Sequence, residues 1–447
     1  MFHFKKITIF RILIVPFLAV ANLWAADTDS PLILSMSDAL QLAQKRQVDV
    51  VVAQERVQQA IARVGQSRSS YLPHLTGGIS QSRQTRDLRS SGISLGSDPV
   101  LGPFNAFDAR IKLTQTIFDV AAIQRLKAAG EERQLSEAEY DKIKQDVMAL
   151  VATLFIEAQR AAQREKVFLS LVSRDEKKLR LAYSRLKLGI GSNLEIKQAK
   201  ADYARSLHDR QFAHSQSIER RLDLAAALGI PSDRPIVFKA EEIAWEEKFI
   251  SKNERVKALN LHPELRVAQE LVHQKKSERL MESAEYLPKI SALADYGNSG
   301  IEPDDASETY MLGVQATMPI FEGGLRSARI EEAESRLKES EANLQNVGRQ
   351  LEALALSADE SIREAKALLK NKASELSASL EELNLVRQKF QTGWASEIEL
   401  LEIKAMARLS QDQKQEAEAA YLTAQVSLAH ALGKMEQIMD DKDRSYR

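Results

Sequence analysis

Residues 189–195 read GIGSNLE and residues 393–399 read GWASEIE, so the spacing G-x-x-S-x-x-E occurs twice in one chain. A glycine readily takes the left-handed conformation that ends a helix. A serine placed three residues later can cap the next helix, and the glutamate three residues beyond it can complete a capping box. Each stretch therefore predicts a tight hairpin between two helices, whose tip exposes Gly189, Ile190, Gly191 and Ser192 in the first hairpin and Gly393, Trp394, Ala395 and Ser396 in the second.

The sequence around the hairpins is also repeated. Several markers recur in the same order, which indicates an internal duplication. They are Tyr71-Leu72-Pro73 and Tyr286-Leu287-Pro288, Ile117-Phe118-Asp119 and Ile320-Phe321-Glu322, the two hairpin motifs, and Ala227-Leu228-Gly229 and Ala431-Leu432-Gly433.

Both copies predict the same order of elements. A first helix ends near a proline, since a helix rarely continues through the residue before proline. Two strands follow, then a very long helix, the tight hairpin and a return helix. The first helices are expected at about 37–70 and 254–285, the long helices at about 120–188 and 325–392, and the return helices end near 228 and 432.

The strands are identified by alternation of apolar and polar residues. Ile111 and Leu113 alternate with Arg110 and Lys112, for example. Period two over about 10 residues is typical of a transmembrane barrel strand, although one such strand would also suit a soluble sheet. Four strands cannot close a membrane barrel, so several subunits would have to share one. The predicted strands are about 74–83, 106–118, 288–297 and 309–321.

The long helices carry apolar residues at steps of three and four, which predicts helix-on-helix packing. A helix of about 68 residues is about 100 Å long, a length that no globular domain needs. A cytosolic coiled coil could use such a length, but it would need neither the strands nor an export signal.

The N-terminus has the order of a secretory signal: Lys5, Lys6 and Arg11, then an apolar run at 12–20, then small residues. We therefore predict a signal peptide over residues 1–25, cleaved after Ala21 or Ala25. A membrane anchor is the alternative, but the run is shorter than the about 20 residues that span a bilayer.

Composition excludes several classes of function. The chain has no cysteine, which removes disulfides, thiolate catalysis and cysteine-based metal sites. Its net charge of −1 gives no reason to expect nucleic acid. No catalytic motif stands out, and the seven histidines are scattered, with His208 and His214 on different helix faces. We expect no enzyme activity, no cofactor and no metal site.

The duplicated plan with G-x-x-S-x-x-E at both tips resembles the TolC-like outer-membrane efflux protein family, over about residues 36–434. The resemblance implies a mainly α protein with a membrane β-barrel part. Three protomers would form a 12-stranded barrel in outer-membrane lipid of a Gram-negative bacterium, continued by a long α-helical barrel that forms a periplasmic tunnel. The tips would meet a periplasmic adaptor that links the tunnel to an inner-membrane pump.

The resemblance also implies a domain plan and a gate. Repeats would occupy 26–228 and 253–434, and the segment 229–252 between them would pack outside the tunnel near its middle, with a charged tail at 435–447. An acidic ring would narrow the tunnel at the tips, formed by Glu399 and Glu402 with Glu195 as partner. Some members lock the tip with an Arg and a Tyr, where this chain has Ala395 and Phe390.

These observations predict a passive exit duct of a tripartite efflux or type I secretion system. A periplasmic coiled-coil adaptor or scaffold is the alternative from another class. The strands distinguish the two, because a scaffold has no use for lipid-facing bands.

Overall fold

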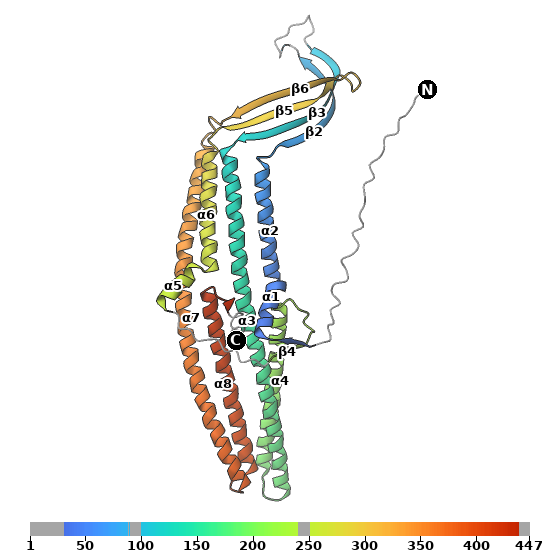
Figure 1. Ribbon diagram of the computed structural model, residues 1–447. Coiled ribbons are helices and arrows are strands. Elements are labelled where there is room, and N and C mark those ends of the chain that lie inside the picture. Colours follow the sequence, from blue (N-terminus) through green and yellow to red (C-terminus); the bar gives the residue numbers. More distant parts are fainter. Residues whose placement is uncertain (1–30, 88, 90–99, 240–250, 438–447) are drawn as a thin grey trace, which may run out of the picture.

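The computed structural model describes residues 31–87, 89, 100–239 and 251–437, which form a long helical shaft with a sheet at one end (Figure 1). The predicted signal peptide at 1–25 and the tail beyond residue 437 lie outside the described residues. Within the described ranges, no helix is both long and apolar enough to cross a membrane.

Two long helices, α3 (Val120–Lys187) and α7 (Leu325–Gln391), run the whole length of the shaft (Figure 1). In the half near the sheet they pack against α2 (Val48–Ser69) and α6 (Pro263–Ala284). In the other half they pack against the return helices α4 (Asn193–Ala227) and α8 (Glu397–Ala431). This is the plan that the duplication predicts. Because α3 also packs against α6 and α8, the first copy is joined to the second along its length.

The first helix of each copy is broken in two, which corrects the single helices predicted from sequence. In the first copy α1 (Met36–Arg46) and α2 meet at Gln47, whose backbone is extended and whose side-chain Oε1 caps α2 by accepting from Asp49 N–H. In the second copy α5 (Lys252–Asn260) ends before α6, which begins at Pro263. Proline lacks an N–H and restricts the residue before it, so the second break follows from the sequence.

The largest apolar core lies at mid-length of the shaft. The short strands β1 (Leu32–Leu34) and β4 (Ile236–Phe238) pair in parallel there and pack with α1 and the middle of α3. Phe155 is fully buried and meets Phe238 edge to face at 5.3 Å. The described part of the segment between the copies, residues 229–239, contributes Ile230, Ile236 and Phe238 to this core, while most of its other residues are exposed. Residues 240–250 lie outside the described ranges.

The sheet has the order β2 (His74–Asp87), β3 (Val100–Phe118), β5 (Lys289–Gly300) and β6 (Ser307–Thr317), with antiparallel neighbours throughout. The strands of the first copy are longer than predicted. The last strand ends at Thr317 rather than 321, because Pro319 has no N–H to donate to a neighbouring strand.

The two faces of the sheet differ as the alternation predicts. One face carries the aligned residues Ile111, Tyr296 and Tyr310. The other carries Arg110, whose guanidinium pairs with Asp295 at 2.8 Å and with Asp108 at 2.6 Å. Large apolar side chains on the first face are mostly exposed in the single chain, including Tyr310 at 77 %.

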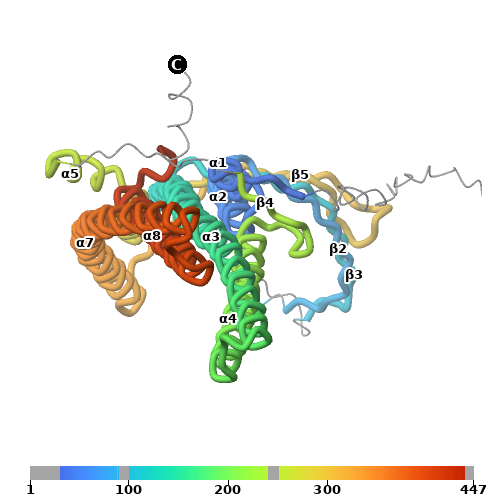
Figure 2. Tube along the Cα trace, turned by 90° about the horizontal axis from the view of Figure 1, so that it is seen from below, coloured from blue at the N-terminus to red at the C-terminus, as the bar shows by residue number. Residues whose placement is uncertain are grey.

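The chain does not close on itself. Seen along the shaft, the helices form a curved wall, and the strands continue this curve rather than sealing into a ring (Figure 2). The edge strands β2 and β6 are unpaired on their outer sides within the described residues. The open helical wall and the unpaired edge strands both leave edges that a further copy of the chain could cover.

Candidate functional site

Both hairpin tips form tight turns. In the first, Gly189 has a φ of +73°, and the N–H of Ile190 donates to Arg185 O at 3.0 Å. In the second, Gly393 has a φ of +81°, and the N–H of Trp394 donates to Lys389 O at 2.8 Å. These bonds satisfy carbonyls at the helix ends, as a glycine in the left-handed region allows.

The serines cap the return helices, but the capping boxes are only half formed, which corrects the prediction. Ser192 Oγ accepts from Glu195 N–H at 3.2 Å, and Ser396 Oγ accepts from Glu399 N–H at 3.2 Å. Neither glutamate returns a bond to the serine N–H among the described contacts. The Glu195 carboxylate instead lies 3.9 Å from the Arg185 guanidinium, whose charge attracts it.

The proposed acidic residues have unequal surroundings. Glu402 pairs with Lys178 of α3, with Oε1 and Nζ 2.9 Å apart. The Glu399 side chain forms no ion pair or hydrogen bond with the described residues. No local sequence pattern marks Lys178, because its partner lies far along the chain and only the contact between α3 and α8 brings the two side chains together.

The tips expose large apolar side chains. Trp394 is 85 % exposed, Leu188 is 74 % exposed, and Ile190 and Leu194 are also exposed. Trp394 is therefore not packed inside its own hairpin. Exposed apolar groups that cluster in this way are typical of surfaces that bind another protein.

Above the tips, ion pairs tie α8 to α3. Arg160 Nη1 lies 2.9 Å from Asp412 Oδ1, and its Nη2 donates to Glu416 at 2.8 Å. The side chains of Arg160 and Asp412 are only 10 % and 12 % exposed. Nearer the middle, His430 Nε2 lies 2.7 Å from Asp146 Oδ1. The sequence analysis missed these pairs, since nothing local marks them.

His262 contacts the end of α8 near His430 and caps α6. Its Nδ1 accepts from Glu264 N–H at 3.1 Å, and its Nε2 lies 3.1 Å from the carbonyl of His430. Burial lowers the pKa of His262. Burial acts to raise the pKa of Asp146, but the hydrogen bond and charge of His430 outweigh it, so this pKa is lowered.

The histidines differ in their surroundings. His214 pairs with Glu165, with Nδ1 and Oε1 2.7 Å apart, and does not meet His208 in a metal-binding group. His273 does meet two carboxylates, Glu270 on its own helix and Glu131 on α3. The sequence analysis missed this group, because Glu131 belongs to the other copy of the duplication.

Known proteins resemble this chain in sequence. The protein CyaE of Bordetella pertussis is 25 % identical over 70 % of this chain. The alkaline protease secretion protein AprF of Pseudomonas aeruginosa is 21 % identical over 62 % of this chain. The pyoverdine export outer membrane protein OpmQ of the same species is 23 % identical over 89 % of this chain. The matches span 65 %, 59 % and 85 % of those three proteins.

The fold is that of a solved channel, and a family model covers most of the chain. The crystal structure of the CmeC outer membrane channel of Campylobacter jejuni superposes with a TM-score of 0.77 at 17 % identity, over 92 % of this chain and 90 % of CmeC. The model of the family described as outer membrane efflux protein matches residues 39–230 and 255–434. The chain therefore belongs to the outer membrane efflux protein family and lies in the outer membrane of a Gram-negative cell, with its helical shaft in the periplasm.

Proposed function

We propose that the chain is one of three identical protomers of a passive exit duct, which conducts substrates from an inner-membrane pump across the periplasm and the outer membrane. The observation that carries the proposal is the four-stranded sheet with two open edges. Its edge strands β2 and β6 are antiparallel to each other, because the strand order β2-β3-β5-β6 alternates direction at every step. β6 of one protomer can thus pair with β2 of the next in the same antiparallel manner.

Three such sheets give a barrel of 12 strands with no free edge. The apolar face with Ile111, Tyr296 and Tyr310 then meets lipid, and the face with Arg110 lines the lumen, as the alternation in membrane barrels requires. The curved wall of helices continues the barrel as a tunnel (Figure 2).

The tips serve as the docking surface for a periplasmic adaptor in this proposal. The exposed side chains of Leu188, Ile190 and Trp394 supply apolar anchors there. The duct itself does no chemistry, so energy comes from the pump to which the adaptor connects. The relatives are named for protease secretion and for pyoverdine export, which supports export as the shared role of such ducts.

The alternative function, a periplasmic coiled-coil adaptor or scaffold, accounts for the shaft but leaves the sheet without a role. Tyr310, Leu312 and Val314 are each more than two-thirds exposed on the edge strand, with values of 77 %, 76 % and 71 %. A scaffold in water would not expose such a band, whereas a barrel in lipid would.

Disulfide trapping tests the assembly, because the chain has no cysteine of its own. A cysteine at Leu75 on β2 is combined with one at Tyr310, Leu312 or Val314 on β6, and the membranes are oxidised. We expect at least one combination to give a covalent trimer on a denaturing gel. Single-cysteine variants are the controls and should stay monomeric. Failure of all three pairs, together with a monomeric mass in mild detergent, would contradict the trimer.

We further propose that the tips of the three protomers form the acidic gate. Glu399 and Glu402 lie three residues apart, on one helix face, and crowded carboxylates attract cations. Lys178 offsets part of the charge at Glu402, with which it pairs at 2.9 Å. We therefore expect a pore that prefers cations and that divalent cations block from the periplasmic side.

Planar-bilayer recordings test the gate. Glu402→Ala should lower the cation preference and the sensitivity to block, and Lys178→Ala should raise both, because it frees the Glu402 carboxylate. If Glu402→Ala combined with Glu399→Ala keeps full selectivity and full block, the acidic-ring assignment is wrong while the duct itself stands.

A further inference from the structure

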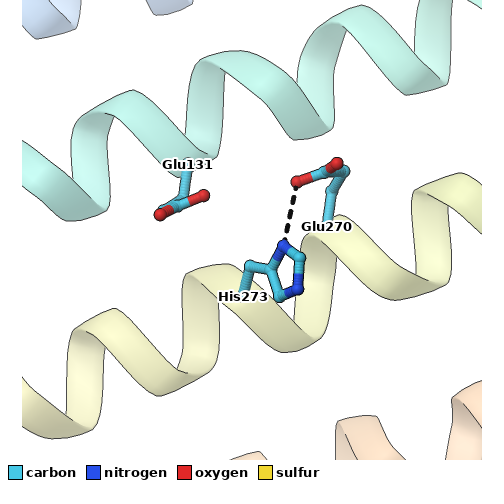
Figure 3. A group of neighbouring side chains, drawn as sticks. All are labelled: Glu131, Glu270 and His273. Atoms are coloured by element: carbon cyan, nitrogen blue, oxygen red, sulfur yellow. Dashed lines mark ion pairs between the residues drawn. The ribbon is translucent and has the colours of Figure 1, made fainter.

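Three side chains of types that can ligate a metal meet between the two copies of the duplication. Glu270 and His273 lie on α6, and Glu131 lies opposite them on α3 (Figure 3). One ligand atom from each residue lies within 4.8 Å of the others. Glu270 and His273 are three residues apart, so they share one face of α6. The same Glu-x-x-His spacing holds metal ions inside helix bundles.

The carboxylates of this group lack partners that would offset their charge. Glu131 forms no hydrogen bond or ion pair with any described residue. Glu270 Oε2 is fully buried and accepts no hydrogen bond from the described residues, and His273 Nδ1 lies 3.4 Å from it. A buried carboxylate oxygen without a hydrogen-bond donor destabilises the folded chain, because it has lost its contact with water. A cation bound between these side chains would remove that cost.

We propose that Glu131, Glu270 and His273 bind one Zn²⁺ ion per chain. Imidazole nitrogen with carboxylate oxygen is a donor set that suits zinc, whereas Mg²⁺ and Ca²⁺ take oxygen ligands. Tetrahedral zinc with bonds of about 2.0–2.2 Å holds its ligand atoms about 3.3–3.6 Å apart. The 3.4 Å separation of His273 Nδ1 and Glu270 Oε2 already has this value. Glu131, whose carboxylate oxygen lies within 4.8 Å of the other two ligand atoms, completes the set by side-chain rotation, and water takes the fourth position.

The ion would join the two copies of the duplication. Glu131 belongs to the first copy and the other two ligands belong to the second, so zinc bridges α3 and α6 in the half of the shaft next to the sheet (Figure 1). A ligand that binds only the folded chain stabilises it by mass action. Zinc is therefore a stabiliser of the shaft in this proposal, and the site is independent of transport through the duct.

Metal titration of the full, untagged chain in detergent tests the proposal, since a polyhistidine tag would bind the same ions. After treatment with a chelator, Zn²⁺ binding is followed by calorimetry, and Co²⁺ serves as a spectroscopic probe of tetrahedral geometry. We expect one ion per chain, and a Zn²⁺ affinity at least tenfold lower in His273→Ala and in Glu131→Gln. Mg²⁺ should not compete.

The pair His214 and Glu165 provides a matched control, because it has one imidazole and one carboxylate but no third ligand among the residues that the structure describes. His214→Ala should leave the zinc affinity unchanged. Zn²⁺ should also raise the melting temperature of the unsubstituted chain and of His214→Ala, but not that of His273→Ala. Helical content measured without metal checks that each variant is folded. The absence of stoichiometric binding, or binding that folded His273→Ala and Glu131→Gln both retain, would overturn the site.

Discussion

The middle of the shaft and its tips are both formed where return helices meet the long helices, but the two regions bury their side chains differently. At mid-length, Phe155 and Met148 of α3 are fully enclosed by side chains of the same chain. At the tips, Leu188, which directly follows α3, and Trp394, in the turn after α7, are mostly exposed. The middle therefore stabilises the single chain, whereas the tips keep apolar surface available for a partner.

Charged residues follow the same division. The pair Arg160–Asp412 is enclosed, with side chains 10 % and 12 % exposed. The side chains of Lys178 and Glu402 are 22 % and 48 % exposed. A half-exposed pair contributes about 0–1 kcal/mol, because water and salt screen it. Loss of one partner of an enclosed pair costs more, since the other charge stays buried. Sensitivity to mutation should thus decrease from the middle of the shaft to the tips.

The largest loss of folding stability is expected for Phe155→Ala in the central core. Removing a large buried aromatic ring costs about 3–5 kcal/mol. Urea unfolding followed by circular dichroism measures the loss. Phe212→Ala is the matched control, because Phe212 is 60 % exposed and should change stability by less than about 0.5 kcal/mol. Equal effects of the two substitutions would remove the distinction between core and surface.

Asp412→Ala should have the second-largest effect. Arg160 would keep its bond to Glu416 but lose the enclosed carboxylate, at a cost of about 2–3 kcal/mol. The double variant Arg160→Met with Asp412→Leu should regain most of this stability, because it leaves no buried charge. If Asp412→Ala were as stable as Lys178→Ala, the enclosed ion pair would contribute no more to stability than the exposed one.

A smaller, pH-dependent effect is expected at His262. Its Nδ1 accepts a backbone hydrogen bond only when that nitrogen is unprotonated, and burial lowers its pKa below the ordinary 6.5. The unfolded chain then binds the proton more readily, so stability is present above pH 6.5 and is lost as pH falls towards the lower folded pKa. Asp146, Glu264 and His430 are the titratable groups that neighbour His262.

His262→Asn isolates this contribution, because asparagine caps a helix but does not titrate in this range. Its stability should fall less than that of the unsubstituted chain between pH 7 and pH 5. Because Asp146, Glu264 and His430 remain in both proteins, the difference in slope reports His262. Identical slopes would contradict the assignment.

The smallest effect is expected at the tip, for Ser396→Ala. The serine cap of α8 contributes about 1 kcal/mol, and the half-formed capping box adds no second bond. Hydrogen exchange of residues 397–400 should quicken locally while the unfolding midpoint stays almost unchanged. Ser396→Asn should retain the protection, because asparagine caps as well as serine. A large drop in the midpoint would show that the tip contributes to global stability.

Much of the architecture could be predicted from the sequence because it depends on local patterns. The duplication, the long helices and the two hairpin turns follow from periodicity and from glycine and serine at fixed spacing. The break before α6 also had a local cause, since Pro263 cannot continue a helix that precedes it. The family and the outer-membrane location, both expected from these patterns, are confirmed by the family match.

Other features depend on residues far apart in the chain, and no local pattern marks them. Lys178 meets Glu402, Arg160 meets Asp412, and Glu131 meets His273 only because α3 packs against helices of the second copy. The break at Gln47 likewise lacks a proline or glycine. The sequence by itself thus determined the elements and their order, through short-range backbone and hydrophobic preferences. Only the tertiary structure decided which charges are enclosed, paired or left open, because burial and partnership are set by the packing of distant helices.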